Sequence, residues 1–276
     1  MSQAVQQLFE NLWQDYVAIT PSAKRIHALL ESSENSQSDI VNDHIALRTF
    51  NLDKVSLDKL AAHFLSLGYK QGGEYHFEEK KLYAQHFEHP DPKVAKVFIS
   101  ELLVEQLSEE AQNIIAKMVE HVDAEKVADS SFLYSGAHWP LSQSDYQTLV
   151  QESEYAAWMS VWGFRANHFT VSVNQLNETQ DLADVNEKLK NAGFLLNQSG
   201  GEIKGSAEVF LAQSSTIADR IAVNFDEGEM IVPSCFYEFA QRYPMSNGEL
   251  YSGFVAASAD KIFESTNTTT DIKKAG

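Results

Sequence analysis

The feature that most constrains the fold of this chain is one pattern that occurs twice. Each copy begins with a strand led by histidine, HIALRTF at 44–50 and HFTVSV at 168–173, followed by an amphipathic helix that ends at Gly68 or Gly193. The histidine-to-glycine spacing is 24 positions in the first copy and 25 in the second. Recurrence of the same landmarks in the same order indicates an internal duplication, so we predict two related modules.

Strand-like runs complete each copy, because short apolar or alternating stretches are typical of strands. We expect strands at 75–77, 82–87 and 95–104 in the first copy, and at 194–197, 208–212, 221–225 and 230–239 in the second. Both series end in a strand with one acidic residue among apolar neighbours, Glu101 in FISELLV and Glu238 in CFYEFA. The glycine-to-glutamate spacing is 33 in the first copy and 45 in the second, so the second copy should carry an insertion.

The predicted fold class is therefore α+β, with two βαβββ-type modules around a shared cleft. The residues before 31 show helical spacing broken at Pro21, the polar stretch 31–38 indicates a loop, and the segment between the modules looks helical. We expect one globular domain over 1–264, with modules at about 42–105 and 165–245, added N-terminal helices, a helical insert at about 107–162 and a flexible tail at 265–276.

The net charge and the number of cysteines limit the possible partners and the cellular compartment of this protein. The chain has 39 acidic and 21 basic residues, a net charge of −18, which argues against nucleic acid or an anionic membrane as a partner. A small acid stays compatible, because one locally placed arginine can outweigh a distant field. The single cysteine, Cys235, permits no disulfide, and neither a long apolar run nor a leader-like start is present. These features predict a cytoplasmic protein.

Strand alternation indicates which side chains share a face. His44 and Arg48 should share one face of the first strand, and His168 and Thr170 one face of the corresponding second strand. Two such polar faces meeting in a cleft would bring two imidazoles together. Neutral imidazole is a good ligand for iron, zinc, copper and nickel, and one carboxylate would complete a three-residue set.

The carboxylate could come from either acidic strand. Glu238 has apolar neighbours, where a carboxylate is costly to bury without a metal or cation, although Arg220 or Arg242 could instead pair with it. Glu101 could be a fourth ligand, a hydrogen-bond acceptor behind the ligands, or the partner of Arg48. Arg48 could bind a substrate carboxylate bidentately or merely neutralise Glu101. Two histidines and one glutamate suit non-haem Fe(II) oxygenases and also catalytic zinc, so these residues alone do not select the metal.

Four segments resemble a known family, the iron-dependent 2-oxoadipate dioxygenase/decarboxylases: DHIALRTF, FISELLVEQLS, FRANHFTVSV and VPSCFYEFAQR. The resemblance covers about 44–243 and implies a fold similar to that of the vicinal-oxygen-chelate superfamily, in which paired βαβββ modules form a metal-bearing cleft. It also implies that His44, His168 and Glu238 bind the metal, and that Arg48 is the catalytic residue that binds the substrate carboxylate. The resemblance gives no firm role to Glu101.

The function implied by the resemblance is that of an Fe(II)-dependent dioxygenase/decarboxylase. Such an enzyme would convert a 2-oxo acid similar to 2-oxoadipate, together with O₂, into a 2-hydroxy acid and CO₂. One alternative is a metalloenzyme of the vicinal-oxygen-chelate type, a hydrolase, lyase or isomerase that uses another divalent metal such as zinc, nickel or manganese. Another is a non-catalytic binder of small acids. All three readings exclude nucleic acid and membrane as partners.

Overall fold

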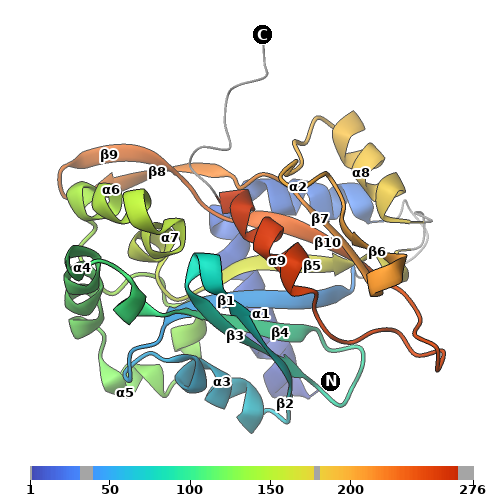
Figure 1. Cartoon of the computed structure of the whole chain (residues 1–276), viewed down its shortest axis with the longest axis horizontal. Coiled ribbons are helices and arrows are strands. Elements are labelled where there is room, and N and C mark those ends of the chain that lie inside the picture. The colour runs from blue at the N-terminus through green and yellow to red at the C-terminus, as the bar shows by residue number, and fades with distance from the viewer. Residues whose placement is uncertain (1, 32–39, 177–180, 267–276) are drawn as a thin grey trace.

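The computed structural model describes residues 2–31, 40–176 and 181–266 of the chain. Its centre is an eight-stranded mixed sheet with the order β2-β3-β4-β1-β5-β10-β7-β6 (Figure 1). The first module contributes β1 (Asn42–Phe50), β2 (Lys70–Phe77), β3 (Leu82–Glu88) and β4 (Lys96–Leu102). The second contributes β5 (Ala166–Ser172), β6 (Lys204–Ser206), β7 (Leu211–Ser215) and β10 (Phe236–Arg242).

The two halves of the sheet have the same strand order when read outward from its centre. The first half runs β1-β4-β3-β2 and the second β5-β10-β7-β6. The pairs β1–β4 and β5–β10 are both parallel, and the halves meet through the antiparallel pair β1–β5, where Ile45 lies opposite Phe169. Between β7 and β10 the chain forms a separate hairpin of β8 (Arg220–Phe225) and β9 (Gly228–Pro233), the insertion expected in the second copy. This symmetry supports the predicted duplication.

Each module has one helix, and the two helices end in the same way. They are α3 (Leu57–Ser66) and α8 (Leu182–Asn191). Gly68 and Gly193 follow them with φ values of +96° and +86°, which residues with a Cβ rarely adopt. After α3 the N–H groups of Gly68 and Tyr69 donate to carbonyls of the last turn, and Gly193 and Phe194 do the same after α8. This pattern is the Schellman motif, and it confirms the predicted glycine caps.

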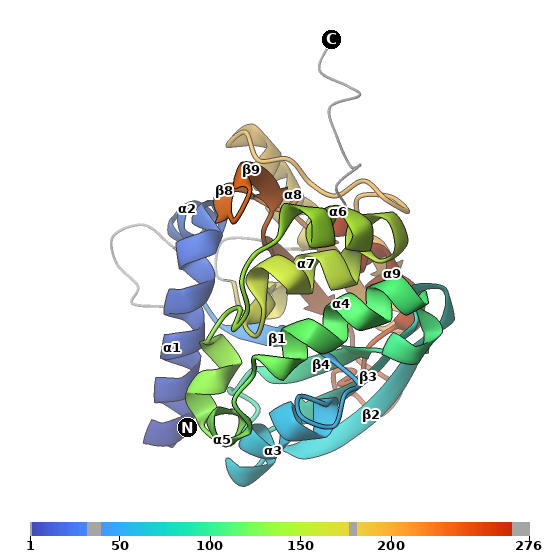
Figure 2. The same ribbon diagram turned by 90° about the vertical axis from the view of Figure 1, so that its left-hand side faces the viewer.

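The other helices cover the sheet. They are α1 (Gln3–Ile19), α2 (Pro21–Leu30), α4 (Glu109–Glu120), α5 (Ala124–Val127), α6 (Gln143–Glu152), α7 (Glu154–Trp162) and α9 (Ala256–Phe263). The insert helices α4, α6 and α7 pack together, apart from α1 and α2, which contact β5 and β10 (Figure 2). Helix α9 contacts β2 near one end of the strand order and β6 near the other, so the sheet curls around α9. Within the described ranges, the helices are too short or too polar to span a bilayer.

Several expected strands of the second module were wrong. Residues 194–197 form only one isolated bridge, between Leu196 and Thr216. A 3₁₀ turn, η5 (Ala207–Val209), replaces the start of the run expected at 208–212, where β7 begins only at Leu211. The run expected at 230–239 is two strands separated at Ser234 and Cys235. Apolar composition alone could not distinguish these turns and breaks from strand, because a strand also needs a hydrogen-bonding neighbour.

The start of the expected flexible tail also differs. Ser265 and Thr266 are buried and follow α9 in a 3₁₀ turn, η6 (Glu264–Thr266). Hydrogen bonds offset the cost of burying these polar residues. The Ser265 hydroxyl accepts one from Asn197 Nδ2 at 2.8 Å and shares another with the Ser215 hydroxyl at 2.9 Å. The remainder of the tail, 267–276, and most of the expected loop at 31–38 lie outside the described residues.

Candidate metal centre

Three adjacent strands bring the predicted ligands together at the centre of the sheet. His44 comes from β1, His168 from β5 and Glu238 from β10. Glu238 Oε2 lies 3.2 Å from His168 Nε2, and its Oε1 lies 3.5 Å from His44 Nε2. One donor atom from each residue lies within 4.8 Å of the other two. The side chains are buried, with exposed fractions of 2% for His44, 5% for His168 and 1% for Glu238.

This geometry fits a divalent metal ion. Two ligand atoms that each lie about 2.1 Å from a metal, at right angles to each other, are separated by about 3 Å. The distance from Glu238 Oε2 to His168 Nε2 is close to that value, and His44 Nε2 lies slightly farther from the other carboxylate oxygen. Glu238 Oε2 is buried and has no hydrogen-bond donor among the described residues, so a cation would provide its missing partner. Two imidazoles and one carboxylate on one side of an ion leave its other positions open.

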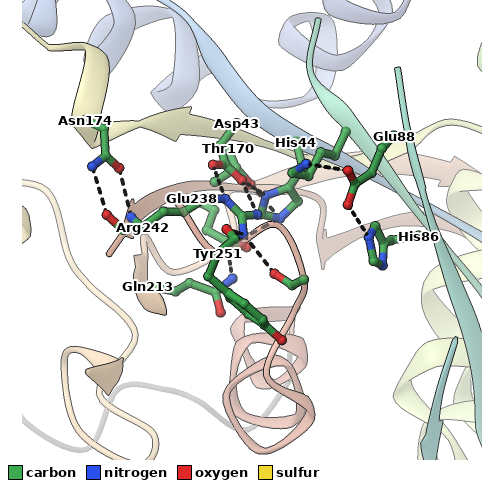
Figure 3. Close-up of polar contacts among 12 residues, drawn as sticks. Asp43, His44, His86, Glu88, Thr170, Asn174, Gln213, Glu238, Arg242 and Tyr251 are labelled. Carbon is green, nitrogen blue, oxygen red and sulfur yellow. Dashed lines mark hydrogen bonds and ion pairs between the residues drawn. The ribbon is translucent and has the colours of Figure 1, made fainter. Parts of the chain in front are cut away.

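Further polar groups hold the candidate ligands in place (Figure 3). The Gln213 amide Nε2 donates to Glu238 Oε1 at 2.6 Å, which leaves Oε2 for the ion. The Thr170 hydroxyl lies 3.1 Å from His44 Nε2. Arg242, which could have paired with Glu238, instead forms an ion pair with Asp43 at 2.7 Å. Neither Gln213 nor Asp43 was predicted from the sequence, although Asp43 directly precedes a candidate ligand.

Burial changes the protonation of two ligands. It raises the pKa of Glu238 to about 7, partly opposed by His44 and by the hydrogen bond from Gln213. Burial, with smaller contributions from His44 and Arg48, lowers the pKa of His168 well below its usual value. The His168 imidazole is therefore neutral at neutral pH and available to bind a metal, whereas Glu238 must lose its remaining proton to do so.

Metal affinity should therefore depend on pH. We expect the affinity for a divalent ion to fall about tenfold per pH unit as the pH drops below about 7, because a proton then competes for Glu238. The folding stability of the metal-free protein has the opposite pH dependence, because it falls as the pH rises. The raised pKa contributes stability that is fully present below the ordinary value of 4.5 and is lost as the pH rises through about 7.

Calorimetric titration with Co(II) at several pH values, in buffers of different ionisation enthalpy, measures both the affinity and the protons released. About one proton per ion should leave at pH 6 and markedly less at pH 8. A constant affinity between pH 5.5 and 8 would contradict the raised pKa of Glu238.

Arg48 lies close to the centre but has an unusual environment. The residue is 2% exposed, and its guanidinium packs on the rings of Tyr155 at 4.8 Å and Trp158 at 4.9 Å. Burial lowers its pKa to about 10, so it stays charged at neutral pH. One nitrogen, Nη2, lies 3.4 Å from the Thr266 hydroxyl, while Nε and Nη1 have no partner in the described part of the chain. A buried cation with unused donors is costly, and a carboxylate ligand would satisfy them.

The centre and Arg48 face two different hollows. The hollow at the centre has a volume of about 20 Å³, enough for about one water molecule. Its walls are His44, Phe98, His168, Gln213, Glu238, Phe254, Ala259, Ile262 and Phe263. Arg48 lines the second hollow, of about 210 Å³, and Phe263 at the end of α9 lines both. A ligand that reaches from the centre to Arg48 would therefore have to displace the Phe263 ring.

Glu101 does not join the centre. It lies opposite Thr49, and its Oε2 accepts a hydrogen bond from the Leu57 N–H at the start of α3, 2.8 Å away. Glu101 therefore belongs to the helix-covered face and is neither the partner of Arg48 nor a ligand. The residue that corresponds to Glu238 in the first module is Phe98, because each lies opposite the residue two positions after its histidine. The expected match between the two glutamates was wrong, because it counted positions without strand register.

Comparisons with known proteins show which family this chain is similar to. A family model described as 2-oxoadipate dioxygenase/decarboxylase matches residues 3–131 and 123–249. The Arabidopsis thaliana protein of that name, described as chloroplastic, is 36% identical over 91% of this chain and 74% of its own length. Its rice counterpart is 35% identical over 94% of this chain and 78% of its own length.

Solved structures show the same fold. Rice hydroxyglutarate synthase in complex with 2-oxoadipate has a TM-score of 0.88 and 33% identity, covering 97% of this chain and 95% of that one. A Shewanella frigidimarina protein provisionally named a hydrolase also has a TM-score of 0.88, with 58% identity over 93% of this chain and 100% of its own. A Ralstonia eutropha protein assigned by name to the glyoxalase superfamily has a TM-score of 0.70 at 21% identity, covering 92% of this chain and 86% of that one. The predicted fold class is confirmed.

Proposed function

This chain belongs to the 2-oxoadipate dioxygenase/decarboxylase family, and from that premise we propose that it is a metal-dependent enzyme that oxidatively decarboxylates a 2-oxo acid. The observation that carries the proposal is the convergence of His44, His168 and Glu238 beside the buried, partly unpaired guanidinium of Arg48. The first three would hold the metal, and Arg48 would hold the substrate carboxylate.

Fe(II) is the proposed metal, because two imidazoles and one carboxylate with open positions suit non-haem iron oxygenases. When bound, the metal would act as a Lewis acid and as a template for the 2-oxo acid and O₂. Zinc, nickel or manganese could occupy the same donor set. The rings of Phe98 and Phe254 would exclude water from the reacting atoms.

Arg48 would orient the substrate. Either unpartnered donor, Nε or Nη1, can act together with the adjacent Nη2 to donate two parallel hydrogen bonds to one carboxylate, which fixes both the position and the direction of a flexible acid. The aromatic rings of Tyr155 and Trp158 pack against the guanidinium and hold its plane in one orientation. The substrate proposed here is a 2-oxo dicarboxylic acid similar to 2-oxoadipate, which the rice structure contains. Its binding would displace Phe263 from between the two hollows.

Oxygen consumption tests this proposal. We expect protein purified without oxygen and loaded with Fe(II) to consume one O₂ and release one CO₂ for each 2-oxo acid converted to a 2-hydroxy acid one carbon shorter. The assay should include 2-oxo acids of four to seven carbons, with the zinc-loaded protein as control. Absence of iron-dependent oxygen uptake across this series would contradict the proposal.

The provisional hydrolase name of the Shewanella relative gives a reason to test a second function. A hydrolase would cleave ester or lactone substrates without O₂ and with zinc bound. The zinc-loaded protein should therefore be assayed under nitrogen, where hydrolysis without oxygen uptake would favour the alternative. A non-catalytic acid binder would show ligand binding but no turnover with any metal. The expected cytoplasmic location stays a prediction.

A further inference from the structure

The residue directly before each candidate histidine ligand contacts the outer nitrogen of that histidine. Asp43 Oδ1 lies 2.8 Å from His44 Nδ1, and Asn167 Oδ1 lies 3.1 Å from His168 Nδ1. In both cases the imidazole Nδ1–H can donate to an oxygen behind the ring. The lone pair of each Nε2 is then available to a metal ion held between the imidazole and Glu238. The duplication has therefore kept this contact in both modules, but with different chemistry.

The two contacts differ in charge. Asn167 is a neutral amide, whereas Asp43 is a carboxylate that forms a bidentate ion pair with Arg242. Arg242 Nε donates to Asp43 Oδ2 at 2.7 Å, and Nη2 donates to Oδ1 at 2.8 Å. Both side chains of the pair are only 6% exposed. A hydrogen bond to a charged acceptor is about twice as strong as one between neutral groups. His44 is thus held more firmly than His168.

Arg242 also fixes the wall on the other side of His44. Its Nη1 donates to the carbonyls of Tyr251 and Gly253, at 2.8 Å each (Figure 3). Its guanidinium lies 5.3 Å from the ring of Phe254. The Phe254 ring in turn packs edge-on against His44, with centroids 4.8 Å apart. One arginine therefore fixes both the carboxylate behind His44 and the aromatic ring beside it.

We propose that Asp43 and Arg242 form a positioning pair for His44, and that the two histidines are consequently unequal metal ligands. His44, backed by a carboxylate, is the stronger and more rigid ligand, and His168, backed by an amide, is the weaker one. A carboxylate behind an imidazole fixes its tautomer and increases its basicity, and losing such a partner typically lowers metal affinity 10–100-fold. This inference rests on the proposed metal centre.

The chain itself offers the matched substitution. Asp43→Asn gives the first module the arrangement that the second already has at Asn167, with an acceptor kept but the charge removed. Because this change leaves Arg242 buried without its anion, the double variant Asp43→Asn/Arg242→Gln removes both charges together. Asn167→Ala is the comparison in the other module. The measurements are Co(II) affinity by chelator competition, the visible absorption bands of bound Co(II), and the melting temperature of each metal-free protein.

We expect Asp43→Asn and the double variant each to bind Co(II) about 10–100-fold more weakly than the wild type and to shift the visible bands. Asn167→Ala should lose less than tenfold. Wild-type affinity and an unchanged spectrum in the Asp43 variants would overturn this inference alone. An affinity loss that follows the melting temperature, with unshifted bands, would also overturn it, because that pattern belongs to a structural ion pair. Failure of the wild type to bind Co(II) would overturn the metal centre itself and this inference with it.

Discussion

The His168→Ala protein should fold but bind no metal tightly and turn over no 2-oxo acid. His168 Nε2 lies 3.2 Å from Glu238 Oε2, so its removal leaves two ligands where the proposed centre needs three. We expect the affinity for Fe(II) or Co(II) to fall by more than about 100-fold, beyond the usual effect of losing an outer hydrogen-bond partner. Metal content after dialysis, calorimetric titration and oxygen uptake measure the loss, and circular dichroism measures folding.

Glu101→Gln is the control for this prediction. It also alters a partly buried polar side chain in the central sheet, but Glu101 accepts a hydrogen bond from Leu57 on the helix-covered face, and glutamine can still accept that bond. We expect the Glu101→Gln protein to keep metal binding and oxygen uptake within about twofold of the wild type, because substitutions that preserve the local contacts usually have small effects. Normal metal binding by His168→Ala, or its loss in Glu101→Gln, would show that the centre lies elsewhere.

Arg48→Met should separate substrate binding from metal binding. Methionine keeps much of the apolar contact with Tyr155 and Trp158 but removes the donors that a carboxylate would use. Two charge-assisted hydrogen bonds are worth about 3 kcal/mol or more in total, so kcat/KM for a 2-oxo dicarboxylate should fall at least about 100-fold. Co(II) affinity should stay unchanged. Steady-state oxygen uptake and calorimetry measure the two quantities.

The stability of Arg48→Met distinguishes a binding role from a structural one. Because Nε and Nη1 of Arg48 have no partner among the described residues, removal of the charge relieves a cost that offsets the lost ring contacts. The free energy of unfolding of the metal-free protein should therefore change by less than about 1 kcal/mol. A loss of several kcal/mol with unchanged kcat/KM would assign Arg48 to the core instead.

The sequence indicated the modular architecture because its signals are local. The histidine-led strands, the amphipathic helices and the glycines at 68 and 193 each depend on a few neighbouring residues, and the structure has them at the expected places. His44, His168 and Glu238 could be selected because a polar residue at an inward position of an apolar strand needs a partner. The residues alone left that partner open, and the family resemblance favoured a metal.

Other predictions were wrong at positions whose structure depends on strand register or on contacts between residues far apart in the sequence. Glu101 and Glu238 look equivalent by spacing, yet register places Phe98 at the position that corresponds to Glu238. Residues 194–197 are apolar enough for a strand, but they pair only through the single bridge from Leu196 to Thr216. Ser265 and Thr266 are polar, as is typical of a tail, but both are buried. Ser265 is hydrogen-bonded to the distant Asn197, and Thr266 to Phe263.

The sequence by itself thus determined the duplicated order of elements and the chemical types available for a centre, because side-chain alternation, helical periodicity and glycine conformation act over a few residues. Only the tertiary structure decided which groups surround them. Arg242 lies 199 positions from Asp43, and Thr266 lies 218 positions from Arg48. No local pattern marks such pairs, since curling of the sheet and the return of helix α9 across it bring them together.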